Sequence, residues 1–515
     1  MRLRVDRRRC AALVLGLALA LGIGAQESGA TPVAPPDLVI LHFNDFHGQV
    51  LPHRVEDLPG RPVKWMGGYP ALHRVVRETR ERHGDERVWV TNGGDWYQGT
   101  PEGNADRGRG IVELFDHLGV TVSVLGNHEY DHGEDSLLGI LAHARHPILG
   151  ANVRDAGAPA DPDRVRPHLL PYVVRVVAGL RVAVVGLVTR DTPTMSTGPF
   201  GGAAFVPEER ALRDLMPALR RSADAVILLT HCGLADDRAL ARAFPDLTLI
   251  LGGHSHTFVR RPLREGPVWI VQSGARGAAL TRLHLRVREH PRRLEVVDFA
   301  FLELPALEQP EPRADGFVRE RFGALAASWD APIAEVDGDP DTRRGPGSTP
   351  GGNFLCDLLR EAGQAEVAVT NKGGIRDVFP HGPLTRRRVF EIVPFDNTVV
   401  TLEVRGRDLR AALAHGLASP LGPLEIAGAS YEYVVRDGRR ELGRVEIGGE
   451  ELRQDRIYRV ATNSFLAAGG DGHEAFKAGK ELGRSETYIR DLVVQAALAR
   501  KKIRLSADPR VRFSP

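Results

Sequence analysis

Short apolar runs alternate with amphipathic stretches from Pro36 onward, a pattern typical of an α/β fold. The apolar runs predict strands at Leu38–Phe43, Val88–Thr91, Val120–Leu125, Arg181–Leu187, Ala225–Thr230, Leu247–Leu251 and Trp269–Val271. Ligand sites in open α/β sheets gather beyond the carboxyl ends of the strands. The polar residues that directly follow these runs are therefore the first place to look for chemistry.

The pattern changes between Leu304 and Ile333, where Pro305, Pro310 and Pro312 interrupt it and Gly316–Trp329 predicts an amphipathic helix. A chain of 515 residues is longer than one hydrophobic core usually serves, so we place a domain boundary here. A second α/β region is predicted beyond it, with a Gly-, Pro- and Asp-rich loop at Gly338–Gly352. Its strands and then its helices are expected at Ala365–Thr370, Asn397–Val404, Arg456–Ala461, Phe354–Ala362 and Arg407–Leu417.

The N-terminus has five arginines among its first nine residues, an apolar run from Ala11 to Leu21, and small residues around Ala25. This pattern predicts a signal peptide over residues 1–25 and an exported protein, periplasmic or extracellular. The run is short for a membrane-spanning helix, although an uncleaved anchor is the alternative. No apolar tail follows Arg512, so we expect no stable membrane anchor.

The net charge argues against a nucleic-acid-binding protein, and the cysteines argue against a disulfide-stabilised one. The formal net charge of +2 falls to about −2 when the five arginines and one aspartate of residues 1–25 are removed, so we expect no nucleic-acid partner. Cys232 and Cys356 lie far apart in sequence and are expected to stay unpaired. We expect a monomer or a weak dimer.

One hexapeptide concentrates unusual chemistry directly after a predicted strand. The segment Gly126–Asp131 reads Gly-Asn-His-Glu-Tyr-Asp. The amide oxygen of Asn127 can bind a cation, and the imidazole of His128 can bind one or transfer a proton. If the turn is helical, Asp131 shares a face with His128, and its carboxylate can orient the ring.

Four other predicted strands end in metal-competent residues, and together with Asn127 they supply two ligand sets. Asp45, His47, Asp95 and His256 form the first set, and Asp95, Asn127, His231 and His254 form the second. This mixed nitrogen and oxygen ligation suits Zn, Mn, Fe or Co. Two ions about 3.5–4 Å apart can clamp the oxygens of an in-line displacement at phosphorus.

Each of these residues also has an ordinary interpretation. Asp45 and Asp95 could be turn residues, Cys232 beside His231 reads as core, and the His254–His256 segment could be a surface loop. Together, however, these interpretations require independent coincidences at the same structural position. We therefore favour a two-metal site.

The motifs Asn44-Asp45-x-His47-Gly48, Gly93-Gly94-Asp95, Gly126-Asn127-His128-Glu129, Thr230-His231 and Gly253-His254-Ser255-His256 resemble those of calcineurin-like metallophosphoesterases. Their order and spacing resemble the secreted 5′-nucleotidase branch. The resemblance implies a four-layer α/β/β/α metallophosphoesterase domain over residues 36–305, a linker helix over 306–335, and an α/β nucleotide-recognition domain over 336–515. It also implies that His128 is catalytic, with Asp131 orienting it.

The second half of the chain narrows the substrate. Two segments each place a phenylalanine in a turn, Phe395 after Pro394 and Phe465 before a Gly-rich stretch, and two such rings could stack a base at about 1–3 kcal/mol each. A guanidinium such as that of Arg376 suits a phosphate. By resemblance to the nucleotide-recognition domain of 5′-nucleotidases, the substrate-binding residues are Asn371, Gly374, Arg376, Phe395, Phe465 and Asp471.

Two positions depart from that family. An Arg-x-x-Glu element commonly precedes the glycine–asparagine pair, but here Arg343 and Arg344 are displaced and no glutamate is present. Lys372 replaces a residue that is usually glycine. These changes put one phosphate or ribose contact in doubt.

We predict hydrolysis of 5′-nucleoside monophosphates, with hinge movement about the connector from Pro305 to Ile333. The alternatives are a 2′,3′-cyclic-nucleotide phosphodiesterase with 3′-nucleotidase activity, a nucleotide-sugar hydrolase and, more remotely, a non-catalytic nucleotide-binding protein. A sulfur-compound hydrolase would leave the paired aromatics without a role.

Overall fold

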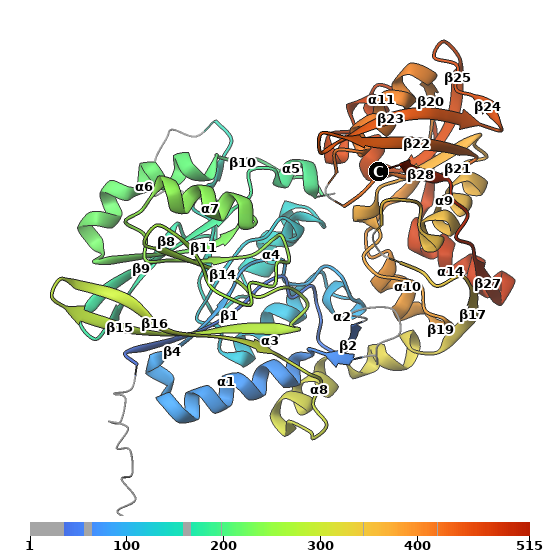
Figure 1. Ribbon diagram of the computed structural model, residues 1–515. Coiled ribbons are helices and arrows are strands. Elements are labelled where there is room, and N and C mark those ends of the chain that lie inside the picture. Colours follow the sequence, from blue (N-terminus) through green and yellow to red (C-terminus); the bar gives the residue numbers. More distant parts are fainter. Residues whose placement is uncertain are drawn as a thin grey trace, which may run out of the picture. The chain divides into compact units, whose positions relative to one another are not determined.

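The computed structural model describes residues 36–55, 64–157, 166–196, 198–342, 345–419 and 421–514 (Figure 1). The expected signal peptide and the displaced Arg343 and Arg344 lie outside these ranges. Within the described residues, no helix is long and apolar enough to cross a membrane.

The N-terminal half contains two six-stranded sheets. The first sheet has the order β16-β15-β1-β4-β5-β6, with strands Arg292–Glu303, Ala279–Glu289, Leu38–Phe43, Val88–Asn92, Val122–Val124 and Ile148–Leu149. The second has the order β13-β14-β12-β11-β9-β8, with strands Leu263–Glu265, Val268–Gln272, Leu249–Gly252, Ala225–His231, Leu180–Val188 and Tyr172–Val177. In each sheet the central strands run parallel, so their carboxyl ends meet at one edge.

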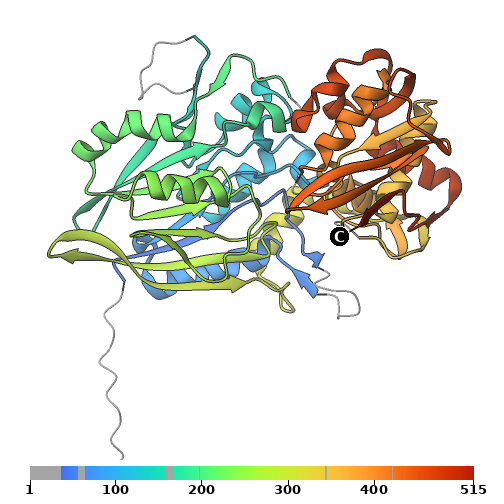
Figure 2. The ribbon, with the colours of Figure 1, turned by 45° about the horizontal axis from the view of Figure 1, so that its top comes forward.

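Helices cover the outer face of each sheet, which gives the four layers α/β/β/α (Figures 1 and 2). The helices on the first sheet are α1 (Tyr69–His83), α3 (Arg109–Leu118) and α4 (Glu134–Leu141), and those on the second are α6 (Glu208–Ser222) and α7 (Leu234–Ala243). Short helices α2 (Pro101–Asn104) and α5 (Thr192–Met195) and short strand pairs β2–β3 (His53–Val55, Lys64–Met66) and β7–β10 (Val153–Asp155, Ala203–Phe205) complete this half.

The pleat of each central strand explains why its side chains belong to two different hydrophobic cores. In β1, Val39, Leu41 and Phe43 belong to the core beneath α1 and α3, whereas Leu38 and Ile40 belong to the core between the two sheets. Successive side chains on a strand point to opposite faces. An unbroken apolar run is therefore what a strand in the middle of four layers requires.

The helix expected at Gly316–Trp329 is α8 and begins four residues earlier, spanning Pro312–Trp329. The helix can begin earlier than predicted because Pro312 occupies the first helical position, where a missing N–H costs nothing. Ala314 and Phe322 join the core beneath α1 and α3. The connecting helix therefore packs on the N-terminal half rather than standing alone.

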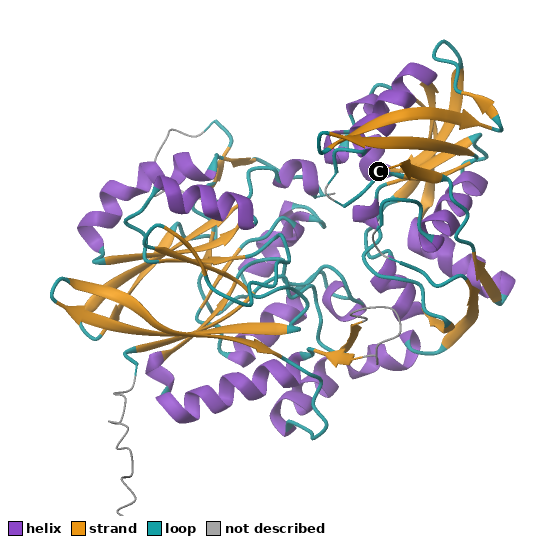
Figure 3. Ribbon diagram, viewed as in Figure 1, coloured by secondary structure: helices purple, strands orange, loops and turns teal. Residues whose placement is uncertain are grey.

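The C-terminal half is also α/β (Figure 3). Its sheets are β21-β18-β25-β20-β26 (Glu425–Ala427, Val367–Thr370, Ile457–Asn463, Thr398–Arg405, Lys480–Tyr488), β19-β17-β27 (Gly382–Thr385, Pro332–Gly338, Lys502–Leu505) and β24-β23-β22-β28 (Glu450–Glu451, Arg439–Ile447, Ala429–Arg436, Val511–Ser514). Its helices are α9 (Pro350–Ala362), α10 (Arg386–Ile392), α11 (Gly406–Gly416), α12 (Ser464–Ala467), α13 (Glu474–Lys477) and α14 (Ile489–Arg500).

The predicted elements are confirmed within one to four residues at their ends, with one correction. The expected loop Gly338–Gly352 is shorter, because Gly338 ends β17 and Pro350 begins α9. The Thr349 side chain accepts a hydrogen bond from the N–H of Gly352 and caps this helix. Proline and glycine here start a helix instead of preventing one.

Both cysteines in the described residues are unpaired, as expected. Cys232 and Cys356 are buried among apolar side chains. Burial raises the pKa of both thiols well above the usual range, so neither is a reactive thiolate.

Candidate metal centre and substrate site

The first predicted ligand set comes together at the carboxyl ends of the strands. Ligand atoms of Asp45, His47, Asp95 and His256 all lie within 4.8 Å of one another. His256 Nε2 is 3.0 Å from His47 Nε2 and 3.2 Å from Asp45 Oδ1. The Oδ2 atom of Asp95 is 3.8 Å from His47 Nε2. Four nitrogen and oxygen donors thus converge on one small volume.

The second predicted set converges beside the first. His231 Nε2 is 3.2 Å from both Asp95 Oδ1 and Asn127 Oδ1. His254 Nδ1 is 3.0 Å from Asn127 Oδ1 and 3.3 Å from His231 Nε2. Asp95 faces this set through Oδ1 and the first set through Oδ2, so one carboxylate joins the two clusters.

The backbone that presents these ligands is unusual. Asp45, His47, Asp95, His254 and His256 have φ values of 50°, 51°, 53°, 77° and 53°. A left-handed conformation costs a non-glycine residue roughly 1–2 kcal/mol. Such conformations cluster at functional sites, where the surrounding structure enforces them. Both members of the Asp45–His47 pair and of the His254–His256 pair thus have left-handed backbone.

Glycines let the ligand loops approach one another. A Cβ atom on Gly126 would lie 2.2 Å from Asp95 Oδ1, and one on Gly94 would lie 2.5 Å from His231 Nδ1. Both distances are far below van der Waals contact. Only glycine at these two positions leaves room for the carboxylate and the imidazole.

Backbone carbonyls fix the orientation of two imidazoles. His47 Nδ1 donates to the carbonyl of Gln98 at 2.7 Å, and His231 Nδ1 donates to the carbonyl of Gly93 at 2.7 Å. With the proton on Nδ1, the lone pair of Nε2 faces the cluster. This arrangement is the one that metal-ligating histidines usually adopt.

Two supporting residues were not singled out as functional by the sequence. Glu129 is fully buried and accepts hydrogen bonds from the N–H groups of Gly126, Asp95 and Trp96 at 2.6, 3.1 and 2.7 Å. Asn44 donates to Asp45 Oδ2 at 2.6 Å. Both stand inside the quoted motifs. The signal available in the sequence was a charged residue, Glu129, in the middle of the hexapeptide Gly126–Asp131.

The electrostatics of the centre suit a cation. Burial holds the pKa of His47 well below its usual range and lowers the pKa of His254 to about 3, so both rings stay neutral. Burial disfavours ionisation of Asp95, but His231 and His128 outweigh it and hold the pKa of Asp95 well below its usual range. Burial opposes a charge on His231, but Asp95 outweighs it and raises the pKa of His231 to about 10, so this ring must release a proton to bind a metal ion. The ionised Asp95 and the neutral rings of His47 and His254 are donors that divalent metal ions bind.

His128 lies at the edge of the clusters, beside its expected partner. The segment His128–Tyr130 forms a 3₁₀ turn, η2, and His128 Nδ1 is 2.7 Å from Asp131 Oδ2. His128 Nε2 is 4.0 Å from Asp95 Oδ2, so this nitrogen points toward the clusters. Burial opposes a charge on His128, but Asp131 and Asp95 raise its pKa overall.

Two of the predicted substrate residues lie next to His128. The Phe395 ring centroid is 5.6 Å from that of His128, and the Arg376 guanidinium carbon lies 5.8 Å from the Phe395 centroid. A residue absent from the predictions, Arg276, donates to the carbonyl of Arg376 at 3.0 Å and to Asp377 at 3.1 Å. No motif or pattern in the sequence marked Arg276 for this role.

The other predicted substrate residues form a second group. Asn371 Nδ2 donates to Asp471 Oδ2 at 2.7 Å, and the N–H of Gly374 donates to the carbonyl of Asn371 at 3.1 Å. Phe465 packs against Gly470, where a Cβ would lie 2.6 Å from the ring. Among the ring contacts of the described residues, none joins Phe395 to Phe465.

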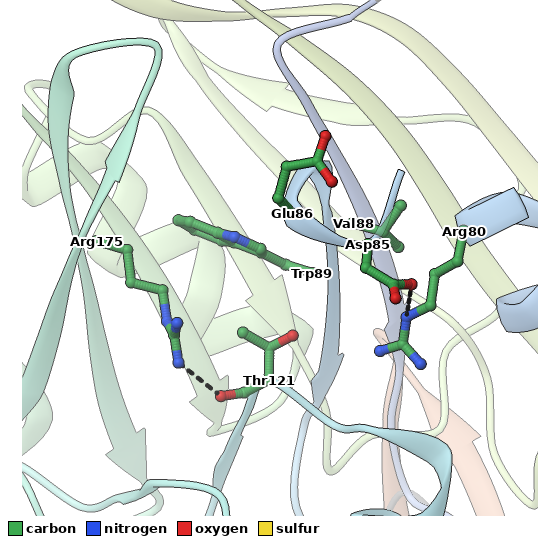
Figure 4. A pocket seen from close by; sticks show the side chains of 7 residues that line it. All are labelled: Arg80, Asp85, Glu86, Val88, Trp89, Thr121 and Arg175. Carbon is green, nitrogen blue, oxygen red and sulfur yellow. Dashed lines mark hydrogen bonds and ion pairs between the residues drawn. The ribbon is translucent and has the colours of Figure 1, made fainter. Parts of the chain in front are cut away.

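A pocket of about 350 Å³ lies elsewhere, and Figure 4 shows its lining residues: Arg80, Asp85, Glu86, Val88, Trp89, Thr121 and Arg175. Val88 begins β4 and Thr121 directly precedes β5, so the pocket opens at the amino ends of these strands. Arg80 pairs with Asp85 at 3.6 Å, and Arg175 donates to the carbonyl of Thr121 at 3.5 Å. Arg80 also donates to the carbonyls of Leu118 and Gly119, so the charged groups of this pocket already have partners within the protein.

Two family models match the chain. The calcineurin-like phosphoesterase model matches residues 38–258, and the 5′-nucleotidase C-terminal domain model matches residues 332–478. The chain is 26% identical to a snake venom 5′-nucleotidase from Crotalus adamanteus, over 86% of this chain and 82% of the relative. It is 26% identical to the 5′-nucleotidase of Homo sapiens, over 93% of this chain and 91% of the relative.

A solved structure agrees with these matches. The crystal structure of a 5′-nucleotidase precursor from Thermus thermophilus superposes with a TM-score of 0.80 at 26% identity, covering 93% of this chain and 100% of that chain. The expected fold class, with an N-terminal metallophosphoesterase domain and a C-terminal nucleotidase domain, is confirmed. The chain therefore belongs to the family that joins a calcineurin-like phosphoesterase domain to a 5′-nucleotidase C-terminal domain, and it is a hydrolase that acts on phosphoric esters, with a candidate metal site.

Proposed function

We propose that this protein is an exported phosphohydrolase that holds two divalent metal ions and converts 5′-nucleoside monophosphates to nucleoside and phosphate. The observation that carries the proposal is the pair of ligand clusters that share Asp95 through its two oxygens. Export rests on the signal-like pattern of residues 1–25, and finding Gln26 as the N-terminal residue of the secreted protein would support it.

The donor atoms fit two metal ions. Asp45, His47, Asp95 and His256 would hold one ion, and Asp95, Asn127, His231 and His254 would hold the other. The described cluster has no thiolate, and its nitrogen and oxygen donors suit Zn, Mn, Fe or Co. When bound, such ions polarise a phosphoryl oxygen and make a nucleophile available at neutral pH.

His128 is the proposed catalytic residue. Its Nδ1–H donates to Asp131, so its Nε2 faces the space beside Asp95 where a phosphoryl group would lie. With its raised pKa, the ring can carry a proton at Nε2, stabilise charge on the phosphoryl oxygens and protonate the leaving oxygen. Asp131 holds the ring in this orientation.

The C-terminal domain would supply the nucleotide contacts. Arg376, within 5.8 Å of Phe395 and beside His128, is placed to bind phosphate. Phe395 and Phe465, both partly exposed, would stack the base. Asn371, Gly374 and Asp471, joined by hydrogen bonds, would bind the sugar through their polar groups.

The test is phosphate release by the purified mature protein after chelation and return of Mn²⁺ or Zn²⁺. The substrates are AMP, UMP, 3′-AMP, 2′,3′-cyclic AMP, UDP-glucose and p-nitrophenyl phosphate. The variant His128→Ala should lose activity by about 10²–10⁴-fold. The control His143→Ala changes an exposed histidine on the same domain and should keep it.

The outcomes separate the hypotheses. Metal-dependent release from 5′-monophosphates that His128→Ala abolishes would support the proposal. Preference for the cyclic substrate or for UDP-glucose would keep the metal centre and replace the substrate class. Nucleotide binding without any phosphate release would favour a non-catalytic nucleotide-binding protein.

A further inference from the structure

Lys372 is one of the two departures from the family pattern. All the hydrogen-bond donors of its ammonium group have acceptors within the protein. It lies in η3 (Lys372–Gly374), directly after Asn371, and its side chain is 1% exposed. Its Nζ atom is 3.1 Å from Glu425 Oε1 and donates to the carbonyls of Gly345 and Gly347 at 3.1 and 2.6 Å. An ammonium has three donors, and each has an acceptor here. No donor remains for a nucleotide.

Glu425 extends the contact into the scaffold. It is fully buried in β21 and accepts hydrogen bonds from the backbone N–H and the hydroxyl of Thr349 at 3.1 and 2.9 Å. Thr349 in turn caps α9 through Gly352. The pair therefore ties together the turn after β18, the segment of Gly345 and Gly347, and the start of α9.

The same turn carries the proposed substrate residues. The carbonyl of Asn371 accepts from the N–H of Gly374, and the carbonyl of Lys372 accepts from the N–H of Ile375, both at 3.1 Å. Arg376 follows directly. Because Lys372 stands inside this hydrogen-bonded turn, fixing its side chain also fixes the backbone on which Asn371 and Arg376 stand.

The segment that Lys372 binds is the one in which the expected Arg-x-x-Glu element is missing. Gly345 and Gly347 have no side chains with which to hold the neighbouring turn. Their carbonyls bind the ammonium instead. The two departures from the family pattern are thus physically linked. The segment that lacks the Arg-x-x-Glu element supplies two carbonyl acceptors, and Lys372 supplies the donor.

We propose that Lys372 and Glu425 form a buried positioning pair that fixes the Asn371–Arg376 turn for nucleotide binding, and that Lys372 does not itself contact the nucleotide. This inference rests on the proposed function. The competing role, in which Lys372 binds the phosphate directly, requires Lys372 to leave three acceptors and would make Glu425 a bystander.

The test compares Lys372→Met, Glu425→Leu and the double variant, using the full chain. Val493→Ala is the control, because it removes buried volume from α14 in the same domain without touching the pair. The measurements are KM and kcat for AMP and for p-nitrophenyl phosphate, thermal stability, and hydrogen exchange of the amides of residues 345–349 and 371–376.

For a positioning pair, each single variant raises KM for AMP by about tenfold, the factor that one charge-assisted hydrogen bond is worth. The value of kcat changes little, and both segments exchange faster. The KM for p-nitrophenyl phosphate rises less than the KM for AMP, because this substrate has a phosphate for Arg376 but no sugar for Asn371. The double variant keeps the raised KM and is more stable than either single variant, because no buried charge is left unpaired. The control loses stability but keeps its KM.

Two results would overturn the proposal. A KM that rises far more in Lys372→Met than in Glu425→Leu would assign direct contact with the phosphate. Lower stability with unchanged KM and exchange would leave the pair a structural role only. If the unaltered protein hydrolyses no nucleotide, the proposed function fails, and the exchange measurements still decide whether the pair fixes the turn.

Discussion

Replacing Gly126 with alanine tests whether Asp95 is the shared ligand of the two clusters. The φ of Gly126 lies outside the left-handed region, so alanine can adopt its backbone conformation. The added Cβ, however, would lie 2.2 Å from Asp95 Oδ1 and 2.4 Å from the Asp95 backbone nitrogen. It would also lie 2.9 Å from Glu129 Oε2. The substitution is therefore a steric probe of Asp95 first and of Glu129 second.

The size of the effect follows from these distances. Ordinary contact begins near 3.4 Å, so the carboxylate must retreat by about 1 Å. Metal–oxygen bonds of about 2.0–2.2 Å do not tolerate such a shift. Because Asp95 faces both clusters, we expect both metal affinities to fall by at least about tenfold and kcat/KM by about 10²-fold.

The assay is metal content after dialysis against a fixed low concentration of Zn²⁺ or Mn²⁺, followed by phosphate release at saturating metal. Gly139→Ala is the control. Gly139 is exposed in α4, and its Cβ would meet nothing within 4 Å. That variant should keep its metal and activity and gain about 0.5–1 kcal/mol in stability.

The reasoning would be refuted if Gly126→Ala bound two metal ions per chain with unaltered affinity while remaining folded. That result would mean that Asp95 can move freely or that it is not a ligand. Loss of one ion with retention of the other would assign Asp95 to a single cluster.

Two further predictions concern neighbouring residues. Asp131→Asn removes a charge that raises the pKa of His128, so the pH at which kcat falls on the alkaline side should move down. A pH–kcat profile that stays in place would contradict the acid role of His128. Arg276→Met removes the donor to the Arg376 carbonyl and should raise KM for AMP by about tenfold without altering metal content, whereas Arg260→Met, at an exposed pair with Glu303, should change neither.

The strands and their cores could be predicted from the sequence because the signal is local. An apolar run such as Leu38–Phe43 is buried on both faces, so its composition alone identifies a strand in a central layer. The candidate ligand residues could be named for the same reason, since each lies at or shortly after the end of such a strand. Helix starts at proline, as at Pro312 and Pro350, were missed because proline also marks loops.

The tertiary structure decided how these residues meet. The left-handed turns at Asp45 and His254 depend on neighbouring loops that hold them there, and no local pattern shows this strain. Arg276 and the pairing of Lys372 with Glu425 join residues that lie 100 and 53 positions apart in sequence. Sequence by itself determined which side chains end the strands, because the pattern of apolar residues along the chain is a local property. Only the packed chain decided their partners, because distance in sequence carries no information about which loops touch.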